Sequence, residues 1–274
     1  MLSAQAGRFR PSGMRIIDLH AHPVHQSRAT SDRDIDRLVA RCRDLGIRHM
    51  NALGDVTRYG ICPPADKLKV LNDESGRLRA RHPDFFSCFC YLNPTLGERA
   101  VMRETERCVR LYGCRGIKLE KANNAAAPCM RHVAKVAREF GLVVLQHTWA
   151  LDAGGVRRIP RRVQSDPADT AAFARKHPDV TVIMAHLTGF GVRGILEVKS
   201  LPNVVIDTSG GFPETGLIEA AVEHLGAERV CYGSDYPIRE HSTTIGRILG
   251  AAISAAARQK ILHDNAARLL GLKS

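Results

Sequence analysis

Residues 15–22 read RIIDLHAH, a short apolar run that ends in two histidines. Near-continuous apolar runs of this length are typical of parallel β-strands that are covered on both faces. Seven further runs follow, and a stretch with helical periodicity separates each from the next. They lie at residues 47–53, 85–93, 115–120, 142–149, 180–186, 204–209 and 230–235. Strands that alternate with helices predict βαβ units and therefore a parallel sheet.

The segments between these runs carry their own helix signals. Ser31 and Asp34 form a capping box just before apolar residues at helical spacing. Other segments with helical periodicity begin after a proline or end at a glycine. We expect helices at residues 31–46, 65–82 and 128–141, and one Ala- and Leu-rich helical segment from residue 242 onward that covers the outside of the sheet.

Eight strands with helices between them predict an α/β fold, a single-domain (β/α)8 TIM barrel. The length of 274 residues is typical for such a barrel. The alternative, a doubly wound open sheet, is expected to have a Gly-rich phosphate-binding turn after the first strand. Residues 18–23 contain no such turn. We therefore expect a catalytic domain over residues 15–274, preceded by a flexible N-terminal segment at residues 1–14.

The composition excludes several classes of protein. With 44% hydrophobic and 25% charged residues, the chain is not disordered, collagen-like or membrane-spanning. Residues 1–14 lack the apolar core of a signal peptide. The eight cysteines show no C-x-x-C spacing, so we interpret them as reduced thiols. These features predict a cytoplasmic protein with no membrane partner.

The formal net charge of +12 raises the hypothesis of a nucleic-acid-binding protein. The basic residues are scattered, however, and a barrel has no recognition helix or zinc finger, so we expect no nucleic-acid partner. One run in the loop after the fifth strand contains Arg157, Arg158, Arg161 and Arg162. Guanidinium groups pair with carboxylates, so we predict that Arg157 and Arg158 bind an acidic small-molecule substrate; an exposed basic loop is the alternative.

Candidate metal ligands lie at the carboxyl ends of the strands, where the chemistry of a barrel is found. His20 and His22, at i and i+2, share one face of a strand and can reach one ion. His147 ends the fifth strand, His186 the sixth and Asp235 the eighth. A single histidine at a strand end is more often structural. Imidazole and carboxylate at four strand ends together predict a metal site.

Three other residues at strand ends, Asn93, Trp149 and Tyr236, are expected to line the substrate pocket. Each follows or ends a predicted strand, so its side chain could reach the same rim as the candidate ligands.

The motifs together resemble those of a known family. IIDLHAH, GIKLE, VVLQH, HPDVTVIMAHLTG, NVVIDTSG, ERVCYGSDYP and DNAARLLGL occur in this order between residues 16 and 272. The order resembles the amidohydrolase superfamily, in particular the amidohydrolase-related branch that includes aminocarboxymuconate semialdehyde decarboxylase. The resemblance implies that His20, His22, His147 and Asp235 are metal ligands. It makes His186 a catalytic residue in one-metal members, or a ligand of the second ion in two-metal members.

The fourth strand bears on the number of ions and leaves two cases open. Two-metal relatives place a bridging carboxylated lysine or a glutamate there, and residues 116–120 read GIKLE. Many members of the branch have a His-Pro pair after the lysine, which Glu120 and Lys121 replace here. We favour one ion, with Lys118 or Glu120 in the pocket wall. A second ion bridged by Glu120, and a salt bridge between Lys118 and Glu120, are the alternatives.

These residues predict one divalent ion, zinc first, with manganese, iron or cobalt as alternatives. Such an ion lowers the pKa of bound water to about 7 and polarises a carbonyl group. Asp235 would accept the water proton and pass it to the leaving group. His186 would stabilise the oxyanion or orient the water, and Asp18, Asp207 or Ser209 would hold the ligand imidazoles.

The leading prediction is therefore a metal-dependent hydrolase of a small carboxylated molecule such as a lactone, ester or amide. A nonoxidative decarboxylase of an unsaturated or aromatic acid, using the same site, is the alternative, and no residue separates the two. A metal-free barrel that only binds a ligand is a further hypothesis. Relatives are often homo-oligomers, but the sequence shows no patch that we assign to an interface.

Overall fold

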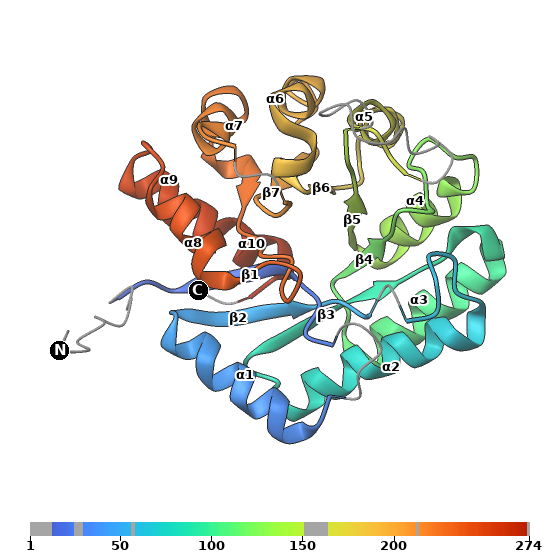
Figure 1. Cartoon of the computed structure of the whole chain (residues 1–274). Helices are drawn as coiled ribbons and strands as arrows, with labels where there is room; N and C mark the ends of the chain where they lie inside the picture. The colour runs from blue at the N-terminus through green and yellow to red at the C-terminus, as the bar shows by residue number, and fades with distance from the viewer. Residues whose placement is uncertain (1–12, 25–29, 56–57, 151–163, 212–213, 273–274) are drawn as a thin grey trace.

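The computed structural model describes residues 13–24, 30–55, 58–150, 164–211 and 214–272. Eight parallel strands form one sheet in the order β1 to β8, and the helices that connect them lie around the strands (Figure 1). The predicted (β/α)8 barrel is confirmed.

All eight strands lie within the predicted apolar runs. Every strand side chain except Arg48 is buried, because the helices cover the outer face and side chains fill the barrel. The strands are β1 (Ile16–Ala21), β2 (Ile47–Ala52), β3 (Phe86–Tyr91), β4 (Gly116–Leu119), β5 (Val143–His147), β6 (Val182–Ala185), β7 (Val204–Asp207) and β8 (Val230–Cys231).

The helices begin and end at the predicted signals. The hydroxyl oxygen of Ser31 accepts from the backbone N–H of Asp34 at 3.2 Å, and Gly141 ends its helix in the left-handed conformation. The α-helices are α1 (Asp32–Asp44), α2 (Ala65–Arg81), α3 (Glu98–Tyr112), α4 (Met130–Phe140), α5 (Pro167–Lys176), α6 (Leu187–Glu197), α7 (Leu217–Leu225), α8 (His241–Leu249), α9 (Ala255–Gln259) and α10 (Asn265–Leu270). Shorter helical segments are η1 (Pro94–Leu96), η4 (Ala227–Arg229) and η5 (Lys260–Asp264).

The C-terminal segment differs from its prediction as one helical segment on the outside. A turn follows α8, and the hydroxyl oxygen of Ser254 caps a new helix by accepting from the N–H of Ala257 at 3.1 Å. Ala266 and Leu270 of α10 pack in one apolar cluster with barrel residues such as Leu145. The last helix therefore covers apolar side chains of the barrel interior, which explains its Ala- and Leu-rich composition.

The barrel closes where β1 meets the residues that follow β8; we call this contact, between residues 19–22 and 232–236, the seam. The backbone N–H of Asp235 donates to the carbonyl oxygen of His20 at 2.7 Å, and that of His22 donates to the carbonyl oxygen of Tyr236 at 2.6 Å. Closure of the barrel thus brings Asp235 next to His20 and His22, which are more than 200 positions away in the sequence.

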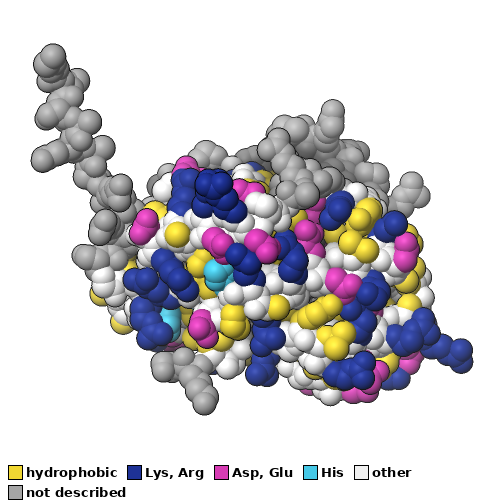
Figure 2. Space-filling model, turned by 90° about the horizontal axis from the view of Figure 1, so that it is seen from below, with side chains coloured by type: hydrophobic (Ala, Val, Ile, Leu, Met, Phe, Trp, Pro, Cys, Tyr) yellow, Lys and Arg dark blue, Asp and Glu magenta, His cyan; other side chains and the backbone are white. Residues whose placement is uncertain are grey.

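Basic and acidic side chains are interleaved on the surface. Figure 2 shows Lys and Arg spread over one face, with Asp, Glu and hydrophobic side chains between them. Between α1 and α2, for example, Arg81 donates to Asp36 at 2.8 Å. Within the described part of the chain, no helix has the length and apolarity needed to cross a membrane.

Candidate active site

His20, His22 and Asp235 form a compact cluster at the seam. One ligand atom from each lies within 4.8 Å of the others, and all three residues are buried. The two Nε2 atoms of the histidines are 3.3 Å apart. Oδ1 of Asp235 lies 3.7 Å from Nε2 of His20 and 3.8 Å from Nε2 of His22. The predicted convergence of these three side chains is thus a feature of the structure.

Hydrogen bonds assign the tautomer of both imidazoles. Nδ1 of His20 lies 2.7 Å from a carboxylate oxygen of Asp207, and Nδ1 of His22 lies 2.8 Å from the carbonyl oxygen of Gly54. Both partners are acceptors, so each Nδ1 carries the hydrogen and each Nε2 keeps a lone pair. Burial holds the pKa of His20 well below its ordinary value, so this ring is neutral. The two Nε2 atoms therefore face each other, with the ammonium of Lys118 3.4 Å from that of His20.

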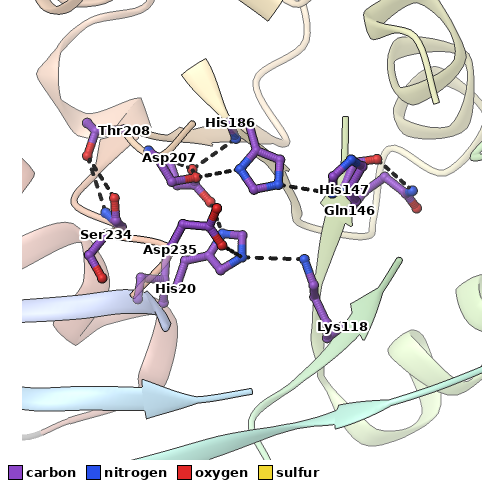
Figure 3. A network of polar contacts seen from close by, with 12 residues as sticks. His20, Lys118, Gln146, His147, His186, Asp207, Thr208, Ser234 and Asp235 are labelled. Carbon is purple, nitrogen blue, oxygen red and sulfur yellow. Dashed lines mark hydrogen bonds and ion pairs between the residues drawn. The ribbon is translucent and has the colours of Figure 1, made fainter. Parts of the chain in front are cut away.

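Asp207, at the end of β7, holds this arrangement in place. One of its oxygens accepts from His20, and the other accepts from the backbone N–H of His186 at 3.0 Å. The same oxygen accepts from the backbone N–H and the hydroxyl of Ser209. Of the three residues that the sequence offered as partners of the ligand imidazoles, Asp207 orients His20 (Figure 3). Ser209 contacts His186.

A chain of hydrogen bonds continues from Ser209 to β5. Because the Ser209 hydroxyl donates to Asp207, its oxygen accepts from Nδ1 of His186 at 2.8 Å. Nε2 of His186 then accepts from Nδ1 of His147 at 3.0 Å. Glu120 Oε1 lies 3.1 Å from that same Nδ1. By this assignment both ring nitrogens of His186 are engaged, and Nε2 of His147 carries a lone pair.

Asp18 accepts hydrogen bonds from both backbone segments of the seam. One oxygen accepts from the N–H of His20 at 3.2 Å and from that of Ser234 at 3.0 Å. The other accepts from the Ser234 hydroxyl at 2.5 Å and contacts Nε2 of His241 at 3.2 Å. Asp18 therefore positions the backbone next to Asp235 rather than a ligand imidazole.

Two residues of the site have unusual backbones. His186 has a φ of 74° and Asp235 a φ of 61°, and among the described residues they are the two that adopt positive φ without being glycine. The left-handed region costs a non-glycine residue roughly 1–3 kcal/mol, and such strain concentrates at functional sites.

Lys118 and Glu120 form a buried ion pair in the pocket wall. Nζ of Lys118 lies 3.8 Å from Glu120 Oε2 and 3.4 Å from Nε2 of His20. Burial opposes ionisation of Glu120, but the charge of Lys118 and the hydrogen bond from His147 hold its pKa well below the ordinary value. The salt bridge that the sequence left as an alternative is present. Burial also raises the pKa of Asp235 to about 7, against the opposite effects of Lys118 and Arg239.

A cavity of about 300 Å³ adjoins the cluster. Its wall contains seven residues that the sequence predicted for the site: His22, Lys118, Glu120, His147, Trp149, His186 and Asp235. The indole of Trp149 packs on Gly189, where an added Cβ would come within 2.5 Å of a ring carbon. Sequence reasoning missed four other wall residues: Lys121, Gln164, Ile238 and Arg239. Their position shortly after a predicted strand or in a strand-to-helix loop was the available signal.

Four predicted pocket residues are not part of this wall as described. Asn93 caps η1 and lines a different cavity, between α2 and α3. The ring of Tyr236 stacks on His241 with centroids 4.6 Å apart. Arg157 and Arg158 lie outside the described residues.

Solved structures with this fold include several decarboxylases. A 2,6-dihydroxybenzoate decarboxylase from Rhizobium is 18% identical, with a TM-score of 0.74 over 94% of this chain and 99% of that one. A 5-carboxyvanillate decarboxylase from Sphingomonas paucimobilis is 16% identical, with a TM-score of 0.69 over 95% of this chain and 100% of that one. A dihydroxybenzoic acid decarboxylase from a Polaromonas species, with bound manganese and the inhibitor 2-nitroresorcinol, is 19% identical, with a TM-score of 0.70 over 94% and 97%.

Comparison of sequences gives the family. No curated protein matches this sequence. The sequence model of a family described as Amidohydrolase matches residues 17–272, from β1 to just beyond α10. The solved structures are less than 20% identical to this chain, so they show only that the fold is shared. The family match, in contrast, is a match of the sequence itself. The chain therefore belongs to the amidohydrolase family, as its motifs predicted.

Proposed function

We propose that this chain is a divalent-metal-dependent, nonoxidative decarboxylase of an aromatic acid. This was the alternative to hydrolysis in the sequence analysis, and the compared structures favour it: all three are decarboxylases of substituted benzoic acids. The family match by itself fits hydrolysis equally well. Fold likeness alone does not assign a reaction, so the proposal also needs support from the site.

The observation that carries the proposal is the pair of facing Nε2 atoms, 3.3 Å apart, on His20 and His22. A divalent cation between these two nitrogens and the carboxylate of Asp235 would be coordinated by all three, whereas the ammonium of Lys118 approaches the His20 nitrogen at 3.4 Å. We assign these three residues as ligands and predict that His147 joins them through its Nε2. Imidazole and carboxylate fit zinc, and manganese is the ion in the Polaromonas structure. When bound, the ion would supply a Lewis acid for the oxygens of the substrate.

Decarboxylation replaces a C–C bond with a C–H bond. A proton must reach the carbon that loses carbon dioxide, and the electron pair of the broken bond forms the new C–H bond. We assign the delivery of this proton to Asp235, which lines the cavity next to the two histidines. His186, with both nitrogens engaged, orients His147 as a positioning residue. The ammonium of Lys118 stabilises negative charge on the substrate.

The test combines metal analysis with a substrate panel. The purified protein should contain about one divalent ion per chain and release carbon dioxide from 2,6-dihydroxybenzoate, 5-carboxyvanillate or a related acid. A chelator should abolish this release, and zinc or manganese should restore it. Turnover of lactones, esters or amides without carbon dioxide release would support the hydrolase instead. Metal-free protein with chelator-insensitive turnover would overturn both.

A further inference from the structure

We propose that Cys88 and Cys114 are the site of a reversible disulfide, which forms when the folded protein meets a peroxide. All eight cysteines of the chain are free thiols in this structure. The two residues lie outside the wall of the active-site cavity, so the inference does not depend on the proposed reaction.

Four of the eight cysteines lie in one layer, between β3 and α3. Cys88 and Cys90 alternate with Phe89 along β3, and Phe89 packs inside the barrel, so the two thiols share the outer face of the strand. Cys108 lies on α3, and Cys114 follows the end of that helix. All four are buried, and Cys114, at 4% exposure, is the most accessible of them.

The sulfurs of Cys88 and Cys114 lie 3.2 Å apart. The backbones of the two segments are neighbours, because the N–H of Arg115 donates to the carbonyl oxygen of Cys88 at 3.3 Å. Neighbouring strands are about 4.8 Å apart, within the Cα separation of about 4.4–6.8 Å that a disulfide spans. An S–S bond is about 2.05 Å long, so the two sulfurs need to approach by only roughly 1 Å.

A metal–thiolate site is the competing use for four cysteines. Zinc–sulfur bonds are about 2.3 Å long, so a tetrahedral site holds every pair of its sulfurs within about 4 Å. In the described part of the chain, no three cysteine sulfurs lie within 4.8 Å of one another. The sulfurs form a row instead, in which Cys114 is hydrogen-bonded to Cys108 and to Cys88. A row of neighbouring thiols favours a disulfide over a shared ion.

Cys108 makes the thiol of Cys114 reactive. Hydrogen bonds from Cys114 and Cys90 lower the pKa of Cys108 to about 6, against the opposite effect of burial, so this thiolate can take the proton of Cys114. The Cys114 thiolate then attacks one oxygen of hydrogen peroxide and the O–O bond breaks, which leaves a sulfenic acid on Cys114 and a hydroxide. The hydroxide takes the proton back from Cys108 and becomes water.

The thiol of Cys88 completes the reaction. Its sulfur attacks the sulfur of the sulfenic acid, the S–S bond forms, and the S–O bond breaks. The proton of Cys88 leaves with the hydroxyl group as a second molecule of water. Two thiols have then lost two electrons, which have reduced one peroxide to two molecules of water, and Cys108 has returned to its initial state.

Mass spectrometry of the wild-type protein tests the pairing directly. The reduced full-length protein would be treated with hydrogen peroxide, its remaining thiols blocked, and the chain digested with trypsin. Cleavage at the arginines places Cys108 and Cys114 in different peptides, whereas Cys88 and Cys90 share the peptide of residues 82–99. We expect the peptide of residues 111–115 to be linked to that of residues 82–99, and dithiothreitol to separate them.

Two matched variants distinguish Cys88 from Cys90. Cys88→Ala should abolish the link, and Cys90→Ala, the same change two residues further along β3, should retain it. The melting temperature is a second readout, because a disulfide that closes the loop from residue 88 to residue 114 restricts the unfolded chain. Oxidation should raise it by roughly 5 °C or more in the wild type and in Cys90→Ala, and should not raise it in Cys88→Ala. Each variant is compared with its own reduced form, which cancels any stability lost through the substitution.

Three results would overturn the inference. The first is a link from Cys114 to Cys90 or Cys108 in place of Cys88. The second is four unmodified thiols in this layer after a treatment that oxidises Cys62, which is exposed and reports that the peroxide was active. The third is a zinc or copper ion that is lost from both Cys88→Ala and Cys90→Ala, since it would identify the four cysteines as a metal–thiolate site.

Discussion

The seam and the region around β3 to β5 differ in how completely their polar groups are bonded. At the seam, Asp18 and Asp207 each accept several hydrogen bonds, and the tautomers of the imidazoles follow from them. Around β3 to β5, behind the cavity wall, polar atoms of Tyr91, Asn123 and Gln146 are buried without a hydrogen-bond partner among the described residues. Leaving such an atom unpaired costs roughly 1–3 kcal/mol.

The difference indicates that the seam is the more tightly held of the two regions. Saturated hydrogen bonds hold side chains in one orientation, which suits a fixed ion. Tyr91, Asn123 and Gln146 are not part of the cavity wall, which β4 and β5 reach through Lys118, Glu120 and His147. Variants in the two regions should therefore differ in whether they affect the ion or only the reaction.

The largest effect is expected from His20→Ala at the seam. Losing several kcal/mol of stabilisation by the ion corresponds to a drop of about a thousandfold in kcat/KM. The bound metal, measured by elemental analysis, should fall with it. His224→Ala, on the partly exposed face of α7, is the control and should keep both metal and activity. Full metal content in His20→Ala would show that the ion is not held at the seam.

A smaller effect should follow from Asp207→Asn. The substitution keeps the shape but places an amide where one carboxylate orients His20 and accepts from His186 and Ser209. Removing partners of this kind lowers metal affinity about 10–100-fold. Metal titrations of the stripped protein would measure it. An affinity equal to that of the wild type would mean that the hydrogen bonds of the seam do not organise the ligands.

Glu120→Gln tests the region around β3 to β5 and should act on turnover more than on metal binding. It leaves the Lys118 ammonium without its charge partner, while Nδ1 of His147 keeps its hydrogen bond to His186. We expect kcat/KM to fall about tenfold, within the range for one catalytic electrostatic contact, with metal affinity closer to wild type than in Asp207→Asn. If metal affinity falls as far in both variants, the two regions are equivalent and the comparison fails.

The smallest effect belongs outside the pocket, at Asp73 of α2. Burial acts to raise the pKa of this carboxyl, but hydrogen bonds from Lys69, Tyr112 and Arg107 outweigh it and lower the pKa to about 2. A carboxyl with a lowered folded pKa contributes stability above its unfolded pKa of about 3.9, and this contribution is lost as the pH falls toward 2.

Asp73→Asn should therefore cost at most about 1 kcal/mol at neutral pH, because the pair is partly exposed. The difference from wild type should vanish near pH 2. Urea unfolding at several pH values would measure it, and metal content and turnover should not change. This variant is the matched Asp-to-Asn control for Asp207→Asn. A stability difference that persists at pH 2 would refute the electrostatic explanation.

The sequence predicted the strands better than the contacts between them. Buried parallel strands are apolar along their length, so all eight were visible as runs. The sequence could not show which of Asp18, Asp207 and Ser209 contacts an imidazole. Asp207 and His20 are 187 positions apart, and no local sequence pattern connects them. The ligand and catalytic roles stay predictions.

Residues just beyond the strand ends were the least predictable. Tyr236 directly follows Asp235, yet its ring turns away to stack on His241, while Arg239, three residues further on, lines the cavity. Loops have no periodicity, so position along the chain does not say toward which side a residue points. The direction of each of these side chains is set by the turns of the closed barrel.

The seam also bears on the order in which this chain folds. The hydrogen bond between Asp18 and Ser234 joins residues 216 positions apart, among the most distant pairs in the protein. Contacts of such separation carry a large loop-closure entropy and form late. A nascent or partly folded chain would hold Asp235 apart from His20 and His22, so an ion in place would mark the molecules that have completed folding.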